Sequence, residues 1–305
     1  MITELRHLPA PAKLNLFLHV TGRRADGYHL LETVFELIDL CDRLHLKLRT
    51  DGQIFRATTL AGVDASQDLG VRAARLLADA CGTGLGVEIR TEKRIPMGGG
   101  LGGGSSDAAT VLLGLNRLWN LNWPTSKLAT LAARLGADVP FFLFGRSAYA
   151  TGIGDKLRAL PMPQRHYLLV APRIQVRTQE VFSAPELTRN TKPVKLFGLL
   201  RGGNVFRGRN DLQSVVLARQ PKVVQALEAL RQAAVACSLD ASLARMTGSG
   251  SCLFLPTASE SQARLVCDQL HGQLDAELFV TRSLPVHPLR DWAFRARLSR
   301  QVHSS

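Results

Sequence analysis

The chain has 305 residues, 46% of them hydrophobic, and a formal net charge of +13 at neutral pH. This length suits one large or two ordinary domains with a proper core, and no apolar run is long enough for a membrane span. The positive charge favours anionic partners, but the basic residues are scattered apart from 290–300 and aromatic residues are not interleaved with them, so we expect small anionic substrates rather than nucleic acid.

The start of the chain, MITELRHLPAPAK, lacks the apolar core of a signal peptide. The five cysteines are odd in number, widely spaced and set mostly in apolar patterns, which is typical of reduced thiols. They form no C-x-x-C motif, and no cluster of histidines in the sequence indicates a metal site. We therefore expect a cytoplasmic protein without a metal held by protein ligands alone.

Leucines alternate with other residues from Leu14 to Leu18, which predicts a half-buried strand over 13–20. Lys13 and Asn15 then share the face opposite the leucines. The next segments along the chain are predicted as strands at 33–38 and 43–49, a helix from Asp68 to near Gly82, and a strand at 85–91.

The stretch 96–110 reads PMGGGLGGGSSDAAT, with six glycines in the seven positions 98–104. Glycine lets the backbone approach a ligand closely, and a helix start behind it presents free N–H groups and a positive dipole end to an anion. Apolar residues at helical spacing after the glycines predict that helix, with Ser105 or Ser106 as its N-cap. A flexible linker is the plainer interpretation, but the run lies between an apolar strand and a patterned helix, which favours phosphate binding.

Several known phosphate loops do not fit this stretch. Gly98, Gly100 and Gly103 satisfy the pattern G-x-G-x-x-G, but the strand does not lead directly into them, and a helix follows where a dinucleotide site needs an acidic strand end. No lysine follows the glycines as in a Walker A motif, and the protein-kinase strings H-R-D and D-F-G are missing. What remains is a glycine loop whose serines could meet phosphate oxygens or magnesium.

The second half of the chain reads as mixed structure. The pattern predicts a helix after Trp119, a hairpin that turns at TGIGD (151–155), and a domain boundary where the composition shifts at 160–165. Beyond the shift, helices are predicted at 195–200, 211–218, 221–237 and 260–270, and strands at 166–171, 242–246, 252–255 and 277–281. Strands and helices in this order suit an α+β fold.

The strings PAKLNLFLHVTGRRADGYH, PMGGGLGGGSSDAAT, GADVPFF and TGSGSCLF follow one another in the order found in the GHMP kinases, the family of galactose, homoserine, mevalonate and phosphomevalonate kinases. The chain resembles that family from about residue 11 to about residue 279. The first string is specific to a member that phosphorylates a cytidine diphosphate sugar alcohol. The resemblance implies an α+β, two-domain GHMP kinase architecture, with an N-terminal α/β-layer domain and mixed sheet carrying the ATP glycine loop at 1–162 and a ferredoxin-like C-terminal domain with a basic tail at 163–305.

Two side chains are candidates for the phosphoryl-transfer step. Asp138 lies in GADVPFF, where an aspartate before a proline commonly caps the backbone N–H groups of a turn. In similar kinases, however, the aspartate of this motif is proposed to accept the hydroxyl proton beside a lysine from the first strand, which Lys13 matches. A nearby ammonium would keep the carboxylate ionised and offset charge on the transferred phosphoryl group. Without the resemblance, Lys13 would be an ordinary solvated lysine at a strand start.

The resemblance also implies the groups that bind the acceptor substrate. Tyr28 and His29 in ADGYH match a pair that grips the cytosine, with Asn15 in the same pocket, although this loop could equally be a surface turn. Thr178 and Phe182 in RTQEVF would flank the substrate, with the phenylalanine on the other side of the base. Taken alone, Phe182 would be read as a helix-core residue.

For ATP, the resemblance implies the glycine loop and its flanks, namely Lys93, Pro96, Met97, Gly98, Gly99, Gly100, Leu101, Gly102, Gly103, Gly104, Ser105 and Ser106. The turn with Gly248 and Gly250 is expected to pack beneath this loop and support it, or simply to connect two strands. Lys93 matches a residue near the adenine, and Asp68 stands where the family often has asparagine. That departure puts one adenine contact in doubt, because an ionised carboxylate cannot donate a hydrogen bond. Mg²⁺ is expected to accompany ATP, and Asp107 could help to hold it.

The function expected from these residues is ATP-dependent phosphorylation of the cytidine diphosphate sugar alcohol, with small molecules as partners and neither nucleic acid nor membrane. The nearest alternative is another GHMP kinase, of the homoserine or mevalonate type. An RNA-binding protein is a second alternative, because a similar α+β architecture occurs in translation proteins, but it leaves the glycine loop without a role. An inactive nucleotide-binding regulator is a third, against which the joint presence of Lys13 and Asp138 argues.

Overall fold

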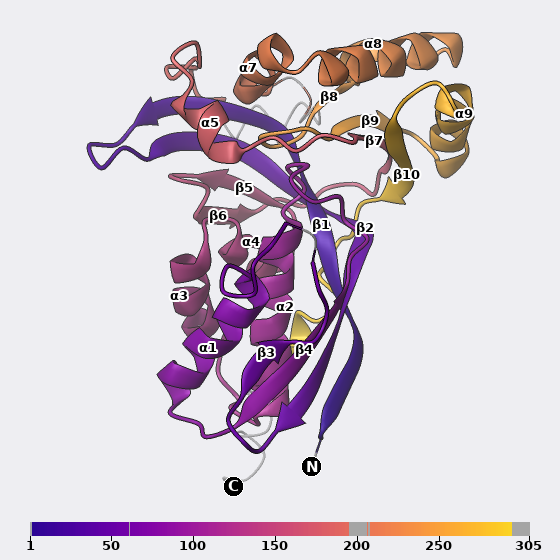
Figure 1. The fold of residues 1–305 in the computed structure, drawn as a ribbon. Helices are drawn as coiled ribbons and strands as arrows, with labels where there is room; N and C mark the ends of the chain where they lie inside the picture. Colours follow the sequence, from indigo (N-terminus) through magenta and orange to yellow (C-terminus); the bar gives the residue numbers. More distant parts are fainter. Residues whose placement is uncertain (1, 61, 195–205, 207, 295–305) are drawn as a thin grey trace, which may run out of the picture.

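The structure is a computed structural model that describes residues 2–60, 62–194, 206 and 208–294 (Figure 1). In these residues the chain forms a large mixed sheet with helices on one side and a smaller antiparallel sheet with its own helices. No helix in these ranges is both long and apolar enough to cross a lipid bilayer.

The first sheet runs in the order β3-β4-β2-β5-β6, with β1 paired to β2. The β3–β4 pair is parallel and the other named pairs are antiparallel. Its strands are β1 (Glu4–Arg23), β2 (His29–Arg49), β3 (Ile54–Arg56), β4 (Gly86–Glu92), β5 (Ala148–Thr151) and β6 (Lys156–Ala159).

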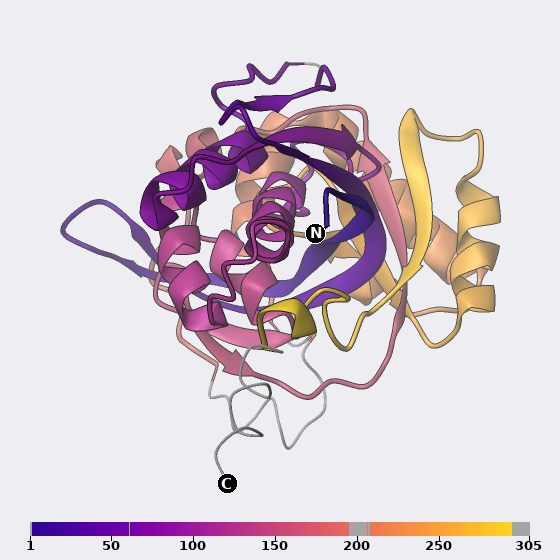
Figure 2. The same ribbon diagram turned by 90° about the horizontal axis from the view of Figure 1, so that it is seen from below.

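Four helices pack on one face of this sheet: α1 (Leu69–Cys81), α2 (Gly103–Leu118), α3 (Thr125–Leu135) and α4 (Val139–Phe144). Figure 2 shows α2 as the central helix, enclosed by the curved sheet and the other helices. Every residue of α2 from Ser106 to Asn116 is buried. Burial on all sides is what a helix with neighbours all round requires.

The second sheet runs in the order β10-β7-β9-β8, and its pairs are antiparallel. Its strands are β7 (His166–Pro172), β8 (Arg245–Met246), β9 (Leu253–Thr257) and β10 (Ala276–Arg282), and its main helices are α8 (Pro221–Ala236) and α9 (Glu260–Leu270). In chain order this is β-α-β-β-α-β, the ferredoxin-like arrangement, so the expected α+β fold class is confirmed. The shorter helices are α5 (Thr178–Ser183), α7 (Asp211–Arg219), the 3₁₀-helix η2 (Ala241–Leu243) and α10 (Asp291–Phe294).

Strand β1 passes through each hydrophobic cluster of the described chain. Leu8 lies in the core between the first sheet and its helices, Leu14 and Leu16 pack between the two sheets, and Leu18 enters the core beneath α8. Every residue of positions 10–20 is buried, so the prediction of a half-buried strand is wrong. The second sheet covers the face with the leucines, the glycine loop and the start of α4 lie against Lys13 on the opposite face, and the β1–β2 pairing shifts between positions 15 and 18.

Some predicted elements need correction. The strands predicted at 33–38 and 43–49 are one strand, β2. The pairing with β1 shifts between Pro11 and Ala12, and the bulge that results lets β2 continue through the residues where its alternation breaks. The strand predicted at 242–246 is instead η2, capped by Asp240, followed by the two-residue strand β8. The pattern missed β3, α4, α5 and α10.

Other predicted elements are confirmed. Asp68 caps the start of helix α1, where its carboxylate accepts the Val71 N–H, and Gly82 in the left-handed conformation caps its end. The TGIGD turn joins β5 to β6, and Pro221 stands at the start of α8. Strands β4, β7, β9 and β10 and helices α3, α7 and α9 lie within a few residues of their predicted positions. The helix predicted at 195–200 and most of the basic tail at 290–300 lie outside the described residues.

The chain leaves the first sheet at Ala159 and enters the second at His166. Contacts nevertheless run both ways, because Leu18 of β1 packs in the second core while Leu289 and Ala293 return to the first core. The domain limits 1–162 and 163–305 therefore stay a prediction.

A buried carboxylate, Glu36 on β2, lies between the two sheets. It accepts a hydrogen bond from the Tyr167 hydroxyl of β7, and its Oε1 lies 3.7 Å from Nη1 of Arg165. Burial raises the pKa of Glu36 to about 7 in spite of these two partners.

We expect Glu36→Gln to remove a pH-dependent part of the stability. Because the folded carboxyl has the raised pKa, folding takes up a proton, and its contribution is fully present below about pH 4.5 and is lost as the pH rises towards about 7. The wild type should lose about 3 kcal/mol across this window relative to the variant. Urea unfolding of both proteins at about pH 5 and about pH 8 measures the difference. The same pH dependence in both proteins would contradict the assignment.

The turn Thr247–Ser251 packs against the glycine loop. The Cys252 N–H donates to the Gly99 carbonyl at 3.2 Å, and a Cβ added at Gly100 would lie 2.5 Å from the backbone oxygen of Thr247. Gly100 also has a φ of +77°, in the left-handed region. The loop therefore has both a backbone conformation and a close approach that only glycine allows.

Gly100→Ala should destabilise the protein more than a left-handed φ alone would. The matched control is Gly272→Ala, where φ is +76° but nothing lies within 4 Å of the added Cβ. We expect the control to lose about 1 kcal/mol and Gly100→Ala to lose on the order of 3 kcal/mol, because a backbone carbonyl cannot move aside as a side chain can. Chemical unfolding measures both losses; equal losses would show that the loop does not rest on the turn.

Candidate active site

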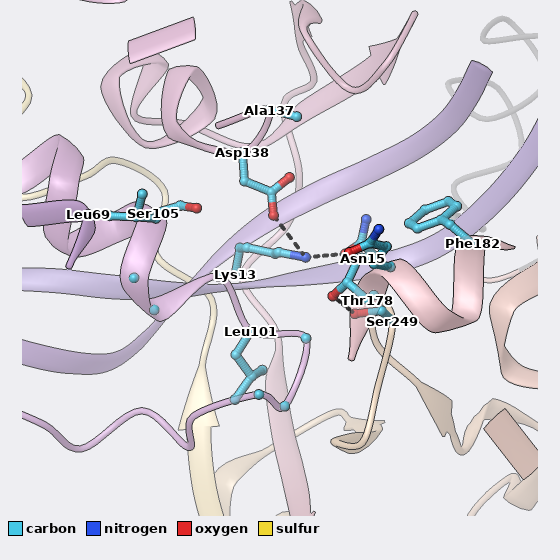
Figure 3. A pocket seen from close by; sticks show the side chains of 18 of the residues that line it. Lys13, Asn15, Leu69, Leu101, Ser105, Ala137, Asp138, Thr178, Phe182 and Ser249 are labelled. Carbon is cyan, nitrogen blue, oxygen red and sulfur yellow. Dashed lines mark hydrogen bonds and ion pairs between the residues drawn. The ribbon is translucent and has the colours of Figure 1, made fainter. Parts of the chain in front are cut away.

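A cavity of about 1090 Å³ is lined by residues from both halves of the chain (Figure 3). Its walls come from β1 and the β1–β2 loop (Lys13, Asn15, Tyr28, His29), the glycine loop (96–105), the start of α4 (Ala137, Asp138), α5 (Thr178, Phe182) and the turn after β8 (Gly248, Ser249). Of the site residues expected from the sequence, all but Ser106 and Gly250 belong to this wall.

The glycine loop turns the backbone toward the cavity at the start of α2. Gly98, Gly100 and Gly102 all have φ between 70° and 77°, and Gly102 is the N-cap of α2 without any side-chain cap. The first N–H groups of a helix have no intrahelical partner, so those of 103–105 are free to meet an anion. The predicted serine N-cap is wrong, because the helix begins earlier, at Gly103.

The two serines lie inside the first turn of α2, in different surroundings. Ser105 lines the cavity and is labelled in Figure 3. Ser106 is fully buried behind the wall, and its hydroxyl has no hydrogen-bond partner in the described structure. Of these two serines, therefore, only Ser105 lies at the cavity wall.

Lys13 and Asp138 point toward one another across the cavity (Figure 3). The Lys13 side chain is 5% exposed, and its Nζ lies 3.7 Å from Oδ2 of Asp138 and donates to Oδ1 of Asn15. Burial lowers the pKa of Lys13, and the Asp138 carboxylate opposes that shift. The interpretation of Lys13 as a solvated lysine is therefore wrong.

The Asp138 side chain does not cap the helix that follows it. Asp138 occupies the N-cap position of α4 with helical backbone angles, but its carboxylate makes no hydrogen bond to the first N–H groups. The capping interpretation, which was the plainer one, is wrong. The carboxylate instead faces the ammonium of Lys13, partly exposed to the cavity.

Asn15 is held in place by three neighbours. Its N–H donates to Oγ1 of Thr247 at 2.8 Å, its Nδ2 donates to Oγ1 of Thr33 at 2.9 Å, and its Oδ1 accepts from Lys13. Lys13 also donates its backbone N–H to the carbonyl of Leu101 at 3.0 Å. These bonds hold β1, the glycine loop and the turn after β8 in one arrangement.

Lys93 lies between two buried carboxylates. Its Nζ donates to Oδ2 of Asp42 and, at 2.9 Å, to Oδ2 of Asp107. The sequence did not single out Asp42, whose Oδ1 also accepts the N–H groups of 94 and 95. Burial raises the pKa of Asp107 to about 7, although Lys93 opposes the shift. Oδ1 of Asp107 is buried without a hydrogen-bond partner.

Asp68 uses both of its oxygens in the described structure. Oδ1 accepts the Val71 N–H and Oδ2 accepts from Nη1 of Arg56 at 2.8 Å. The ion pair is nearly buried, with side-chain exposures of 5% and 12%. The departure from asparagine is therefore matched by Arg56, a partner that the sequence pattern did not indicate.

The residues expected around the acceptor lie together at one end of the cavity. The ring centroids of His29 and Phe182 are 5.2 Å apart, and Oγ1 of Thr178 lies 2.7 Å from Oγ of Ser249. Tyr28 is 60% exposed at the tip of the β1–β2 hairpin, so ADGYH is both a surface turn and part of the cavity wall.

Sequence reasoning missed two further groups of side chains. Arg189, which lines the cavity, donates from Nε to Nε2 of His29 at 3.1 Å. Outside the cavity, His7, His45 and Glu92 bring possible metal ligands within 4.8 Å of one another. Neither group has a sequence spacing that would reveal it, because β-pairing and loop closure bring its members together.

Comparisons with known proteins agree with this architecture. The chain matches the GHMP kinases N terminal domain at residues 68–146 and the GHMP kinases C terminal domain at residues 195–276. It is 52% identical to 4-diphosphocytidyl-2-C-methyl-D-erythritol kinase of Aromatoleum aromaticum, over 95% of this chain and 98% of the relative. It is 51% identical to the enzyme of that name from Ralstonia nicotianae, with the same coverage.

Solved structures give the same result. A crystal structure of 4-(cytidine 5'-diphospho)-2C-methyl-D-erythritol kinase is 35% identical, covers 92% of this chain and 99% of its own, and superposes with a TM-score of 0.73. Homoserine kinase from Cytophaga hutchinsonii shares the fold, with 15% identity, 94% and 96% coverage and a TM-score of 0.70. The chain therefore belongs to the GHMP kinase family, among relatives that are 4-diphosphocytidyl-2-C-methyl-D-erythritol kinases.

Proposed function

We propose that this kinase transfers the γ-phosphoryl group of ATP to the 2-hydroxyl of 4-diphosphocytidyl-2-C-methyl-D-erythritol, a step of the non-mevalonate route to isoprenoids. The observation that carries the proposal is the 3.7 Å approach of the Lys13 ammonium to the Asp138 carboxylate in the cavity that the glycine loop lines. The names of the relatives at about half identity over nearly the full chain supply the acceptor.

The phosphates of ATP bind at the start of α2 in this proposal. The free N–H groups behind Gly102, the positive end of the helix and the Ser105 hydroxyl all face one part of the cavity. No side chain from the loop needs to enter the site, which is why glycine fills it. Lys93 positions Asp42 and Asp107 near the loop, since its ammonium is already bonded to both carboxylates.

Mg²⁺ fits the residues beside the loop. Asp107 lines the cavity, and its buried Oδ1 has no hydrogen-bond partner in the described structure. A cation bound at this oxygen would satisfy it. Asp107 would hold the ion together with the ATP phosphates. When bound, Mg²⁺ neutralises charge on the phosphates and orients them.

Asp138 and Lys13 act on the acceptor hydroxyl and the transferred group. Asp138 orients the hydroxyl and takes its proton as the new oxygen–phosphorus bond forms. Lys13 pairs with that carboxylate and stabilises negative charge on the phosphoryl group. Asn15 holds the ammonium, whose electrostatic effect is stronger because the side chain is buried.

The acceptor binds with its base against His29 and Phe182. Tyr28 closes on the base from the exposed side, and Asn15 and Thr178 contact the sugar alcohol and diphosphate. We propose that small molecules are its only partners, without nucleic acid or membrane. We also place it in the cytoplasm, where ATP is available and thiols such as its five free cysteines stay reduced.

Acceptor specificity is tested by release of ADP from the purified protein. We expect turnover with the cytidine acceptor and none with homoserine or mevalonate. Tyr28→Ala should raise KM for the cytidine acceptor by about 10-fold, a loss typical of one stacking contact, while KM for ATP stays unchanged. Turnover with homoserine or mevalonate in place of the cytidine acceptor would overturn the acceptor and leave the family assignment standing.

Asp138→Asn tests the chemical step. It should lower kcat by about 10²–10⁴-fold, because the amide cannot take the proton, while the Kd for ATP measured by calorimetry stays the same. Asp240→Asn, which changes a surface carboxylate that caps η2, is the control and should keep wild-type kcat. A kcat close to that of the wild type for Asp138→Asn would remove Asp138 from the reaction.

A further inference from the structure

Arg189, which follows α5 in the chain, donates hydrogen bonds to carbonyl groups at the end of that helix. Through Nη2 it donates to the carbonyls of Phe182 and Ala184, at 3.2 Å and 2.6 Å. Through Nη1 it donates to the carbonyl of Leu187 at 3.0 Å. Its Nε donates to Nε2 of His29, at 3.1 Å. The donors of a guanidinium form a rigid planar fork, so this one group holds His29 and the segment that carries Phe182 in a fixed relation.

The hydrogen bond from Arg189 decides which nitrogen of His29 carries the proton. A guanidinium donates and cannot accept, so Nε2 must present its lone pair. The proton of the neutral ring is then on Nδ1, for which the described residues supply no partner. Burial and the positive charges of Arg189 and Arg23 lower the pKa of His29, which keeps the ring neutral.

A donor at Nδ1 distinguishes the two common pyrimidines. At N3, cytosine presents a ring acceptor, whereas uracil presents an N–H. A base lying against Phe182 would accept a hydrogen bond from His29 through cytosine N3, and uracil would set two donors against each other. A site built to hydrogen-bond one partner rejects an analogue that leaves its polar groups unpaired.

We propose that Arg189 is a positioning residue that makes this pocket select cytosine over uracil, by holding His29 as a hydrogen-bond donor at Nδ1. The inference rests on the proposed function, because it takes the base of the acceptor to lie against His29. Arg189 acts on the base through His29. Its Nε–H bond to Nε2 excludes the tautomer that carries the proton on Nε2.

The kinetic test compares the cytidine acceptor with its uridine analogue. In Arg189→Met we expect kcat for the cytidine acceptor to change by less than about 3-fold, its KM to rise by about 10-fold or more, and the cytidine-to-uridine ratio of kcat/KM to fall by at least about 10-fold. If Arg189 had a merely structural role, the substitution would lower kcat/KM for both substrates by the same factor and leave their ratio unchanged. This result would overturn the proposal.

Arg219→Met is the matched control. Arg219 clasps the same segment, through the Glu186 carboxylate and the carbonyl of Glu180, but has no bond to His29. We expect it to keep the wild-type ratio between the two substrates. A similar loss of the ratio in both variants would show that segment order, and not His29, sets the selectivity.

A second readout needs no turnover. Nitrogen-15 NMR of the histidine rings, with His29 assigned by its absence in His29→Gln, should show the Nδ1–H form in the wild type and a mixture of tautomers in Arg189→Met. An Nε2–H form in the wild type overturns the proposal even if Arg189→Met does not fold. If the wild type phosphorylates neither acceptor, the proposed function fails, and the NMR result still decides whether Arg189 holds the ring.

Discussion

One backbone hydrogen bond, from the N–H of Lys13 to the carbonyl of Leu101, ties the first strand to the glycine loop. The bond matters because β1 passes through every hydrophobic cluster of the described chain and cannot move without disturbing them. It fixes where the Lys13 side chain leaves the strand, and Asn15 then fixes where the ammonium lies. The loop, the strand and the turn after β8 are thereby fixed relative to one another, and together they determine the shape of the cavity.

The buried charges around the cavity are paired, and the pairing serves placement more than stability. Lys13 faces Asp138, Lys93 bonds Asp42 and Asp107, and Arg56 bonds Asp68. Ion pairs removed from water return little net stability, because desolvation offsets their attraction, but breaking one leaves an uncompensated charge. Such pairs therefore hold side chains at defined positions while contributing little to the free energy of unfolding. Within the residues that the structure describes, Oδ1 of Asp107 is a buried carboxylate oxygen without a hydrogen-bond partner, beside the loop where phosphates would add more negative charge.

The end of the cavity at which His29 and Phe182 lie is assembled from segments far apart in the sequence. His29 comes from the start of β2, Phe182 from α5 and Ser249 from the turn after β8. Two of them are held by hydrogen bonds to another segment: His29 accepts from Arg189, and Ser249 bonds to Thr178. The walls of this end come from both halves of the chain, so the two halves must keep their relation for the site to exist.

The sequence alone determined what depends on neighbouring residues. The glycine run, the cap at Asp68 and Gly82, and the shared face of Lys13 and Asn15 follow from local conformation and the period of a strand, and the structure agrees with each. Tertiary structure decided what depends on contacts between distant segments. It buried both faces of β1, turned Asp138 from a cap into the partner of Lys13, gave Lys93 two carboxylates and brought Arg189 to His29. The physical reason is that these contacts join segments far apart in the chain, and such pairing has no period that the local sequence displays.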